Sequence, residues 1–178
     1  MTAFTQLITD DRDALVEALR EGQGKGSVLR DVDLSGCDLQ GVDLSEARLS
    51  RANLRGANLE GANLRGAFLD SANLRNTNLS AACMEFAVLG AADLSDADCS
   101  KADLRRSNMV GIDAQRAVFR DAQLYYSRPG NGDFREADFT GADIQRAIFR
   151  RANLAGANLS NTTGTANLDR ANLEGVTR

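Results

Sequence analysis

The side chains that most often carry out catalysis or hold metal ions are scarce in this sequence. It contains no histidine, and the spacing of its three cysteines, Cys37, Cys83 and Cys99, does not match a metal-binding motif. No glycine-rich phosphate-binding motif is present, and no serine or cysteine can be paired with a histidine base. We therefore expect no catalytic residue, no bound metal and no cofactor, and we interpret the protein as a non-enzyme.

The composition restricts the remaining classes of function. The 178 residues suffice for one domain, and the net charge of −4 argues against direct binding of nucleic acid. No signal-peptide pattern is present, and no apolar run approaches the roughly 18 residues of a membrane span. An odd number of cysteines without metal spacing is typical of a reducing compartment, so the sequence predicts a cytoplasmic protein.

The dominant feature of the sequence is a five-residue repeat. Every fifth residue from Leu29 to Leu159 can be taken as the centre of a unit, and 17 of these 27 centres are leucine. Alanine stands two residues before the centre in 18 units, and aspartate or asparagine stands between the two in 18 units. Such strict internal repetition predicts a solenoid built from one supersecondary unit.

The spacing within a unit indicates short strands and tight turns. Alanine and leucine are two residues apart, so they face the same side of an extended strand while the polar residue between them faces the other. A continuous strand would point the next leucine to the wrong face, so the chain must turn within each unit. A helix is excluded because a five-residue step rotates the apolar position by about 140° per repeat. The interior should therefore consist of leucine and alanine.

Units such as Ala52-Asn53-Leu54-Arg55-Gly56 resemble the pentapeptide-repeat family, whose signature is Ala-Asp/Asn-Leu-X-X. The resemblance covers residues 27–178. It implies an all-β fold, a right-handed quadrilateral β-helix with four units, or 20 residues, per coil. About seven coils at roughly 4.8 Å each would form a rod on the order of 35 Å long. We predict two parts, an N-terminal capping helix in residues 1–26 and the β-solenoid in residues 27–178.

The N-terminal segment has the features of a helix over residues 10–21. Thr9 or Asp10 can serve as the N-cap, and Gly22 can end the helix. A solenoid needs a cover over its first coil, so a cap is the interpretation that the sequence favours, with membrane or partner binding as the alternative. The predicted apolar stripe of this helix consists of Ala14, Leu15, Ala18 and Leu19.

Two segments break the repeat. Residues 125–132 keep the five-residue count but place Pro129 at a centre. Because proline cannot donate to a ladder, this segment is either a bulged corner or a contact loop that exposes Tyr125, Tyr126 and Arg128. Residues 160–165 form the second break, after which the centres fall one residue early. We interpret this second break as a local loosening of the final coil.

With 20 residues per coil, the outward positions sort into four sides, and one of them differs from the rest. We call it side four, and its outward residues contain no acid. Valine, phenylalanine and isoleucine are not needed on a solvated face, so side four is the predicted interaction or dimer face, apolar and lightly charged. The predicted partner-binding residues are Phe68, Val88, Val110, Tyr125, Tyr126, Arg128 and Ile148.

The other three sides carry columns of aspartate and asparagine, which suggest a second function. Members of the family that this pattern resembles imitate duplex DNA and bind DNA gyrase or topoisomerase IV. Arginines such as Arg55, Arg75 and Arg105 interleave with these columns, so a salt-bridged surface lattice is the simpler interpretation. The candidate DNA-mimicking residues are Asp93, Asp113 and Asp133 on side one, Asp98 and Asp138 on side two, and Asp103 and Asp143 on side three.

The sequence thus favours a non-enzymatic interaction or scaffolding module that presents a rigid face to a protein partner. The alternative is a DNA-mimicking modulator of a bacterial topoisomerase that protects it against inhibitors. We expect no direct contact with nucleic acid or membrane. We also expect that two copies can pair, either through the open C-terminal coil or through side four.

Overall fold

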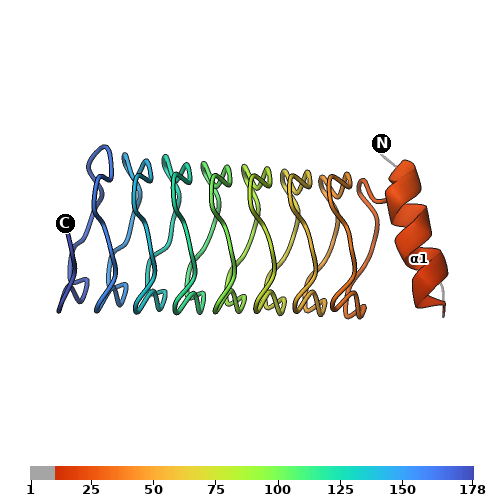
Figure 1. Ribbon diagram of the computed structural model, residues 1–178, viewed down its shortest axis with the longest axis horizontal. Helices are drawn as coiled ribbons and strands as arrows, with labels where there is room; N and C mark the ends of the chain where they lie inside the picture. The colour runs from red at the N-terminus through yellow and green to blue at the C-terminus, as the bar shows by residue number, and fades with distance from the viewer. Residues whose placement is uncertain (1–10) are drawn as a thin grey trace.

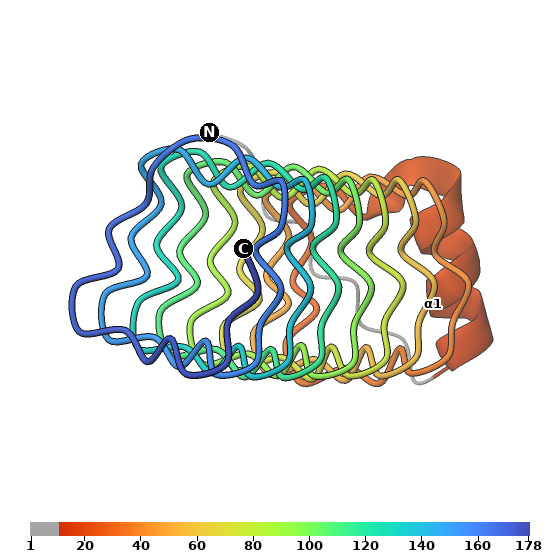
Figure 2. The same cartoon turned by 60° about the vertical axis from the view of Figure 1, so that its left-hand side comes forward.

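The computed structural model describes residues 11–178 and forms a straight rod. The helix α1 (Arg12–Ala18) lies at one end, and stacked coils of nearly equal size follow it to the C-terminus (Figure 1). A π-helical turn, η1 (Leu19–Gln23), links α1 to the first coil. The coils enclose a continuous interior along the whole rod (Figure 2). The protein is therefore a β-solenoid, as the repeat predicts.

Parallel bridges between residues 20 positions apart hold the coils together. Val28 pairs with Arg48 and Asp33 pairs with Asn53, and this register continues to the bridge between Asp143 and Thr163. Within each bridge the hydrogen bonds run both ways. For example, the Leu34 N–H donates to the Asn53 carbonyl at 2.7 Å, and the Asn53 N–H donates to the Val32 carbonyl at 2.8 Å. Because the chain turns after every few residues, the described strands are single-residue bridges.

The interior is formed by the alanine and leucine positions of the repeat. Ala52 and Leu54 are both fully buried, and the same pattern holds along the rod. Where the centres become phenylalanine the rings contact one another, and the rings of Phe119 and Phe139 stack with 4.8 Å between centroids. The Cys99 N–H donates to Val118, so the small Cys99 centre lies one coil from Phe119, as the 20-residue coil requires. Burial raises the pKa of the Cys99 thiol, so it acts as a core residue.

Each corner is a tight turn whose third residue has a left-handed backbone. The Ala57 N–H donates to the Leu54 carbonyl at 3.0 Å, and Gly56 between them has a φ of 66°. Glycine is not obligatory here, because Arg51 has a φ of 60° at the equivalent position. An L-residue in this region costs roughly 1–2 kcal/mol, which the ladder bonds on both sides of the corner must offset.

Two arginines before the first coil complete its backbone hydrogen bonding. In later coils the carbonyls equivalent to Ser35 and Asp38 accept N–H groups from the coil before, but the first coil has no such neighbour. Arg20 donates to the Asp38 carbonyl at 2.9 Å through Nη2, and Arg12 donates to the Ser35 carbonyl. Open strand edges invite further pairing, so these bonds close an edge that would otherwise stay exposed.

The predicted helix differs from the observed one in its start and in its buried face. Asp11 is the N-cap and accepts from the N–H groups of the first turn, whereas the predicted caps Thr9 and Asp10 lie outside the described residues. Of the predicted stripe, Ala14 is exposed. The buried side chains of α1 and η1 are Leu15, Val16 and Leu19, because the largest apolar side chains turn towards the first coil.

Residues 125–132 form part of a coil in register, which excludes the contact loop among the two alternatives that the sequence left open. Pro129 occupies its centre and is buried, and Gly130 is also buried. The segment departs from the pattern in one bond, because Pro129 has no N–H to donate to Ile148 and no bridge joins Arg128 to Ile148. The flanking ladder bonds remain, including Ile148 N–H to the Ser127 carbonyl at 3.0 Å.

The second break shortens the register by one residue. Asp143 pairs with Thr163 at the usual spacing of 20, whereas Ile148 pairs with Asn167 at a spacing of 19. Gly164 takes a φ of 80° where the chain is shorter. The predicted loosening of the final coil is therefore a deletion of one residue, which the left-handed backbone of Gly164 accommodates.

The corner geometry predicts opposite results for alanine at two glycines. Gly56→Ala should lower the free energy of unfolding by about 1 kcal/mol, because it places an L-residue in the left-handed region. Gly90→Ala is the control, since Gly90 is not among the residues with positive φ and an added Cβ would lie 3.8 Å from the Val110 carbonyl oxygen. It should be neutral or slightly stabilising. Urea unfolding followed by circular dichroism measures both, and equal effects would contradict the strain argument.

Candidate interaction surfaces

Side four is a continuous column on the rod. Its bridges connect Val28, Arg48, Phe68, Val88, Asn108 and Arg128 in consecutive coils. On the other sides an aspartate or asparagine at the outward position accepts the N–H two residues later, as Asn53 does from Arg55 at 3.3 Å. Side four has such a residue only at Asn108 among its described outward positions from Val28 to Ile148. It therefore presents side chains that do not serve the turns.

The predicted partner-binding residues lie on side four and on the corner before it. Phe68 and Val88 occupy neighbouring coils, and Phe68 is 43% exposed while Val88 is half-buried. Val110 and Ile148, each 38% exposed, line one shallow depression with Arg128. The two tyrosines, Tyr125 and Tyr126, lie on the corner between sides three and four, with their rings 4.7 Å apart.

That corner carries a row of stacked arginines and aromatic rings that the sequence reasoning missed. The guanidinium groups of Arg65 and Arg106 lie 5.3 Å and 5.6 Å from the ring centre of Phe86. Two coils beyond Arg106, Arg146 lies 5.1 Å from the ring of Tyr126. A search for side chains at a spacing of 20 residues would have found the row. Each stack holds its arginine over the ring, and Arg65 is also paired with Glu85 at 3.3 Å.

Side four also carries arginines at both ends, so the prediction that it is lightly charged is wrong. One shallow depression of about 350 Å³ is lined by Arg30, Arg48, Arg51 and Asp70 beside Phe68. A second, of about 220 Å³, is lined by Arg128, Arg150 and Arg151 beside Val110 and Ile148. The prediction considered mainly the outward column and overlooked the two corner residues that follow each centre.

The candidate DNA-mimicking aspartates stand in the predicted columns, but their carboxylates are engaged locally. Asp93, Asp113 and Asp133 lie in consecutive coils of side one. The Oδ1 atom of each of the seven accepts the N–H two residues later, at 2.9 to 3.2 Å. A carboxylate oxygen in this position closes the turn in place of a backbone group. The columns thus have a structural role in the corners.

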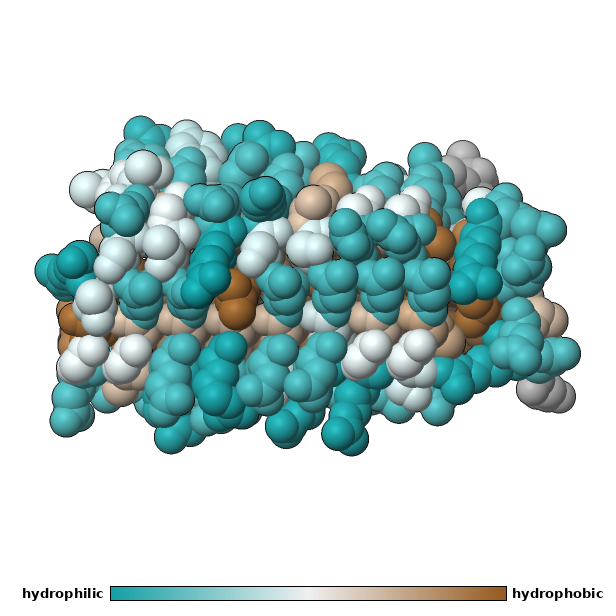
Figure 3. Space-filling model, in the orientation of Figure 1, coloured by the Kyte–Doolittle hydropathy of each residue, from teal (hydrophilic) through white to brown (hydrophobic). Residues whose placement is uncertain are grey.

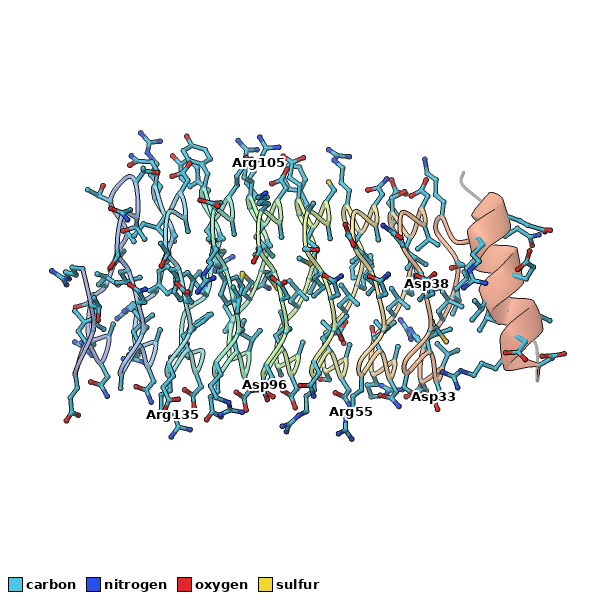
Figure 4. The ribbon with its side chains drawn as sticks, viewed as in Figure 1. Asp33, Asp38, Arg55, Asp96, Arg105 and Arg135 are labelled. Atoms are coloured by element: carbon cyan, nitrogen blue, oxygen red, sulfur yellow. The ribbon has the colours of Figure 1, made fainter. Side chains whose placement is uncertain are left out.

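Several of these carboxylates are also paired with arginine. Arg105 donates to Asp103 at 2.6 Å, Arg135 to Asp133 at 2.8 Å and Arg120 to Asp138 at 2.6 Å. Arg135 lies on one edge of the rod and Arg105 on the opposite edge (Figure 4). Burial alone would raise the pKa of Asp103, but hydrogen bonds from Arg105 lower it overall. Exposed pairs of this kind neutralise the surface while adding little stability.

The space-filling view shows the same regular arrangement on the face towards the reader. Rows of hydrophilic side chains run parallel to the long axis, with a narrow apolar seam between them (Figure 3).

At the C-terminal end of the rod, the last coil leaves Leu168, Leu173 and Val176 only partly buried. Pairing of two copies through this coil stays a prediction.

The repeat chemistry and the 20-residue register can be compared with known families. The family described as "Pentapeptide repeats" matches residues 27–66 and 52–90, with eight copies, and "Pentapeptide repeat region" matches residues 82–159. The chain belongs to the pentapeptide-repeat family. A comparison of this pentapeptide-repeat protein with curated proteins found no match.

Solved pentapeptide-repeat structures resemble the rod. HetL from the cyanobacterium Nostoc sp. strain PCC 7120, involved in heterocyst differentiation regulation, aligns with a TM-score of 0.52 and 23% identity over 91% of this chain and 94% of HetL. Full-length QnrB1, a plasmid-mediated fluoroquinolone resistance protein, aligns with a TM-score of 0.45 and 18% identity over 97% and 88%. A thylakoid-lumen protein of Arabidopsis thaliana gives 0.40 and 28% over 72% of each chain. The HetL likeness supports the fold alone.

The described part of this pentapeptide-repeat protein has neither a membrane-spanning helix nor a metal-binding cluster. Between residues 11 and 178, no helix is long and apolar enough to cross a membrane. The same residues contain no group of three or more histidine, cysteine or acidic side chains placed to hold a metal ion. Cys37 and Cys83 are partly buried, and Arg12 donates to the Cys37 sulfur at 3.1 Å.

The corner ion pairs predict how stability depends on pH. Hydrogen bonds from Arg116 lower the pKa of Asp96, so the pair stabilises the fold above about pH 4, where the unfolded carboxylate is ionised, and the stabilisation is lost as pH falls through the lowered pKa. Asp96→Asn should therefore be less stable than the wild type at pH 7 and equal to it near pH 2. Thermal unfolding between pH 2 and 7 measures the difference.

The control for this prediction removes a carboxylate from the same turn position. Asp121, like Asp96, has a left-handed backbone, but no ion pair joins it to a described residue. Asp121→Asn should leave the stability at pH 7 close to that of the wild type. A gap between wild type and Asp96→Asn that stays constant down to pH 2 would contradict the ion-pair explanation.

Proposed function

We propose that the protein is a non-catalytic interaction or scaffolding module that presents side four to a protein partner. The observation that carries the proposal is the exposure of Phe68, Val110 and Ile148 on the one side whose outward residues do not close the turns. Three large apolar side chains in a line along a rigid surface favour contact with another protein. The partner-binding set also includes Val88, Tyr125, Tyr126 and Arg128.

The proposal also includes the handedness, cross-section and number of the coils and the role of the N-terminal segment. We infer a right-handed quadrilateral β-helix of about seven coils in residues 27–178, and the spacing of 20 residues between bridges supports four units per coil. The predicted N-terminal cap spans residues 1–26, of which residues 1–10 lie outside the described residues. The bonds from Arg12 and Arg20 to the first coil support a capping role for residues 11–26. A cytoplasmic location and pairing of two copies complete the proposal.

The second candidate function, modulation of a topoisomerase by DNA mimicry, is favoured by one observation. Asp93, Asp113 and Asp133 form an unbroken acidic column over three coils. Their carboxylates accept turn hydrogen bonds, and Arg135 pairs with Asp133, so the column is less negative than its sequence implies. The carboxylates of the other candidates accept the same turn hydrogen bond, namely Asp98, Asp138, Asp103 and Asp143. Side four therefore supports the first candidate better.

The two candidates predict different effects of charge. A photo-crosslinking residue in place of Asn108 should form an adduct with the partner in cells that make the protein. The double variant Val88→Glu with Val110→Glu should reduce this adduct at least about tenfold, since it places two charges in an apolar contact. Val118→Glu is the control, because Val118 is the equivalent outward valine of side two. An adduct that is unchanged by the double variant would contradict the role of side four.

The topoisomerase candidate is tested with the same proteins in a DNA gyrase supercoiling assay with a fluoroquinolone. If the acidic column acts, the wild type protects the enzyme and the triple variant Asp93→Asn, Asp113→Asn, Asp133→Asn does not. We expect no protection by either protein. Asparagine keeps the side-chain oxygen that closes each turn, as Asn53 does, so the variant should fold normally.

The capping role predicts a large loss of stability from one buried residue. Leu19→Ala should lower the free energy of unfolding by about 2–5 kcal/mol, because Leu19 is fully buried between η1 and the first coil. Glu17→Ala, at an exposed position of α1, should have little effect. Denaturant unfolding measures both variants. A loss below about 1 kcal/mol for Leu19→Ala would show that the helix is dispensable for the coils.

A further inference from the structure

Side four is a basic strip on an acidic protein. At its outward positions and the two corner residues after each centre it holds three aspartates and seven arginines, whereas the whole chain has a net charge of −4. Asp31 is paired with Arg51, and Asp169 with Arg150. The seven arginines of the strip are Arg30, Arg48, Arg51, Arg128, Arg150, Arg151 and Arg170.

The depression beside Arg128 presents the groups that bind a carboxylate. No ion pair or side-chain hydrogen bond occupies Arg128 or Arg151 within the described part of the chain. In other units the N–H after the centre donates to the outward aspartate or asparagine, as Gln115 does to Asp113, so this N–H points outward. At Gly130 the outward residue is Arg128, and the N–H has no such acceptor. Two guanidinium groups and one N–H therefore surround the depression.

The coil that forms this depression departs from the repeat pattern at two residues, Pro129 and Ser127. Pro129 cannot donate to the Ile148 carbonyl, which removes one ladder bond. The Ser127 hydroxyl is buried without a hydrogen-bond partner, although the equivalent Ser107 donates to the Leu104 carbonyl at 2.8 Å. An unsatisfied buried hydroxyl destabilises the fold. Local inconsistencies of this kind are expected where a surface serves binding and not stability.

The second depression lies in the same column at a fixed distance. Asp70 also lines it and Arg51 is paired with Asp31, so its cationic groups for a ligand are Arg30 and Arg48. Arg48 and Arg128 are outward residues of side four and are four coils apart, which is about 19 Å at roughly 4.8 Å per coil. Between the two depressions the strip exposes Phe68 and Val110. Nucleic acid would require a continuous row of cations, whereas here two groups of arginines flank an apolar stretch.

We propose that side four binds an acidic segment of a partner protein, with one group of carboxylates in the Arg128 and Arg151 depression, a second group in the Arg30 and Arg48 depression, and apolar side chains between them. The proposal rests on the interaction role of side four and names the chemistry of its partner. Extended chain covers about 19 Å in roughly six residues, so the two acidic groups should be separated by about six residues.

A synthetic peptide tests this pattern on the full-length protein. The probe is a fluorescent peptide with two glutamates at each end of a six-residue leucine and alanine core, and its binding is measured by fluorescence anisotropy at low salt. We expect it to bind at least about tenfold more tightly than a peptide with lysines at the ends or one with a serine core. Equal binding of the lysine peptide, tighter binding of single-stranded oligothymidylate, or no binding would overturn the proposal.

Paired variants locate the binding on side four. Arg128→Gln with Arg151→Gln should weaken binding of the glutamate peptide at least about tenfold. Arg55→Gln with Lys101→Gln removes the same charge from exposed positions on sides one and two and should change binding less than twofold. The opposite ranking of the two double variants would overturn the proposal. Unchanged thermal unfolding of both variants shows that the comparison concerns binding and not folding.

The crosslink from position 108 separates this proposal from the broader interaction role. If the adduct forms in cells and depends on Val88 and Val110 but survives Arg128→Gln with Arg151→Gln, side four binds a partner that is not recognised by its acidity, and only the present proposal fails. If the adduct is lost in both double variants and retained in Arg55→Gln with Lys101→Gln, the acidic partner is supported.

Discussion

The parallel backbone ladder between residues 20 positions apart is the constraint on which the rest of this structure depends. Each coil donates to and accepts from its neighbours, as between Leu34 and Asn53, so the position of every residue along the rod is set by one register. The ladder fixes inward and outward positions at the same time. Leucine and alanine therefore stack into a core while outward residues stack into columns, and a surface property repeated at a spacing of 20 becomes a continuous strip.

The same constraint explains which carboxylates belong to the fold. The ladder requires a turn after every centre, and the outward aspartate or asparagine closes that turn by accepting the N–H two residues later. The acidic columns at Asp93, Asp113 and Asp133 are accordingly explained by the corners, without reference to a partner. Side four lacks this residue at most levels, and its exposed Phe68, Val110 and Ile148 have no comparable structural explanation. That contrast is the reason for assigning the interaction to side four.

Departures from the register are absorbed locally because each coil is held by its two neighbours. Pro129 removes one ladder bond and leaves the adjoining bonds in place, so the coil of residues 125–132 stays in line. At Gly164 a missing residue changes the spacing from 20 to 19, and the ladder continues. Proline and glycine in a solenoid thus need not indicate a loop, which is why the contact-loop alternative at Tyr125 and Tyr126 does not hold.

By itself the sequence determined the repeat, the inward and outward positions and the solenoid class, because a five-residue period permits only one alternation of apolar and polar faces. The position of side four also required the 20-residue coil, which the resemblance to the family implied. Together they placed Phe68, Val88 and Val110 on that side. Only the tertiary structure decided what lies beside them. The basic depressions at Arg48 and Arg128 and the stack of Arg146 on Tyr126 join residues from different coils. Their formation depends on side-chain conformations, which a period cannot specify.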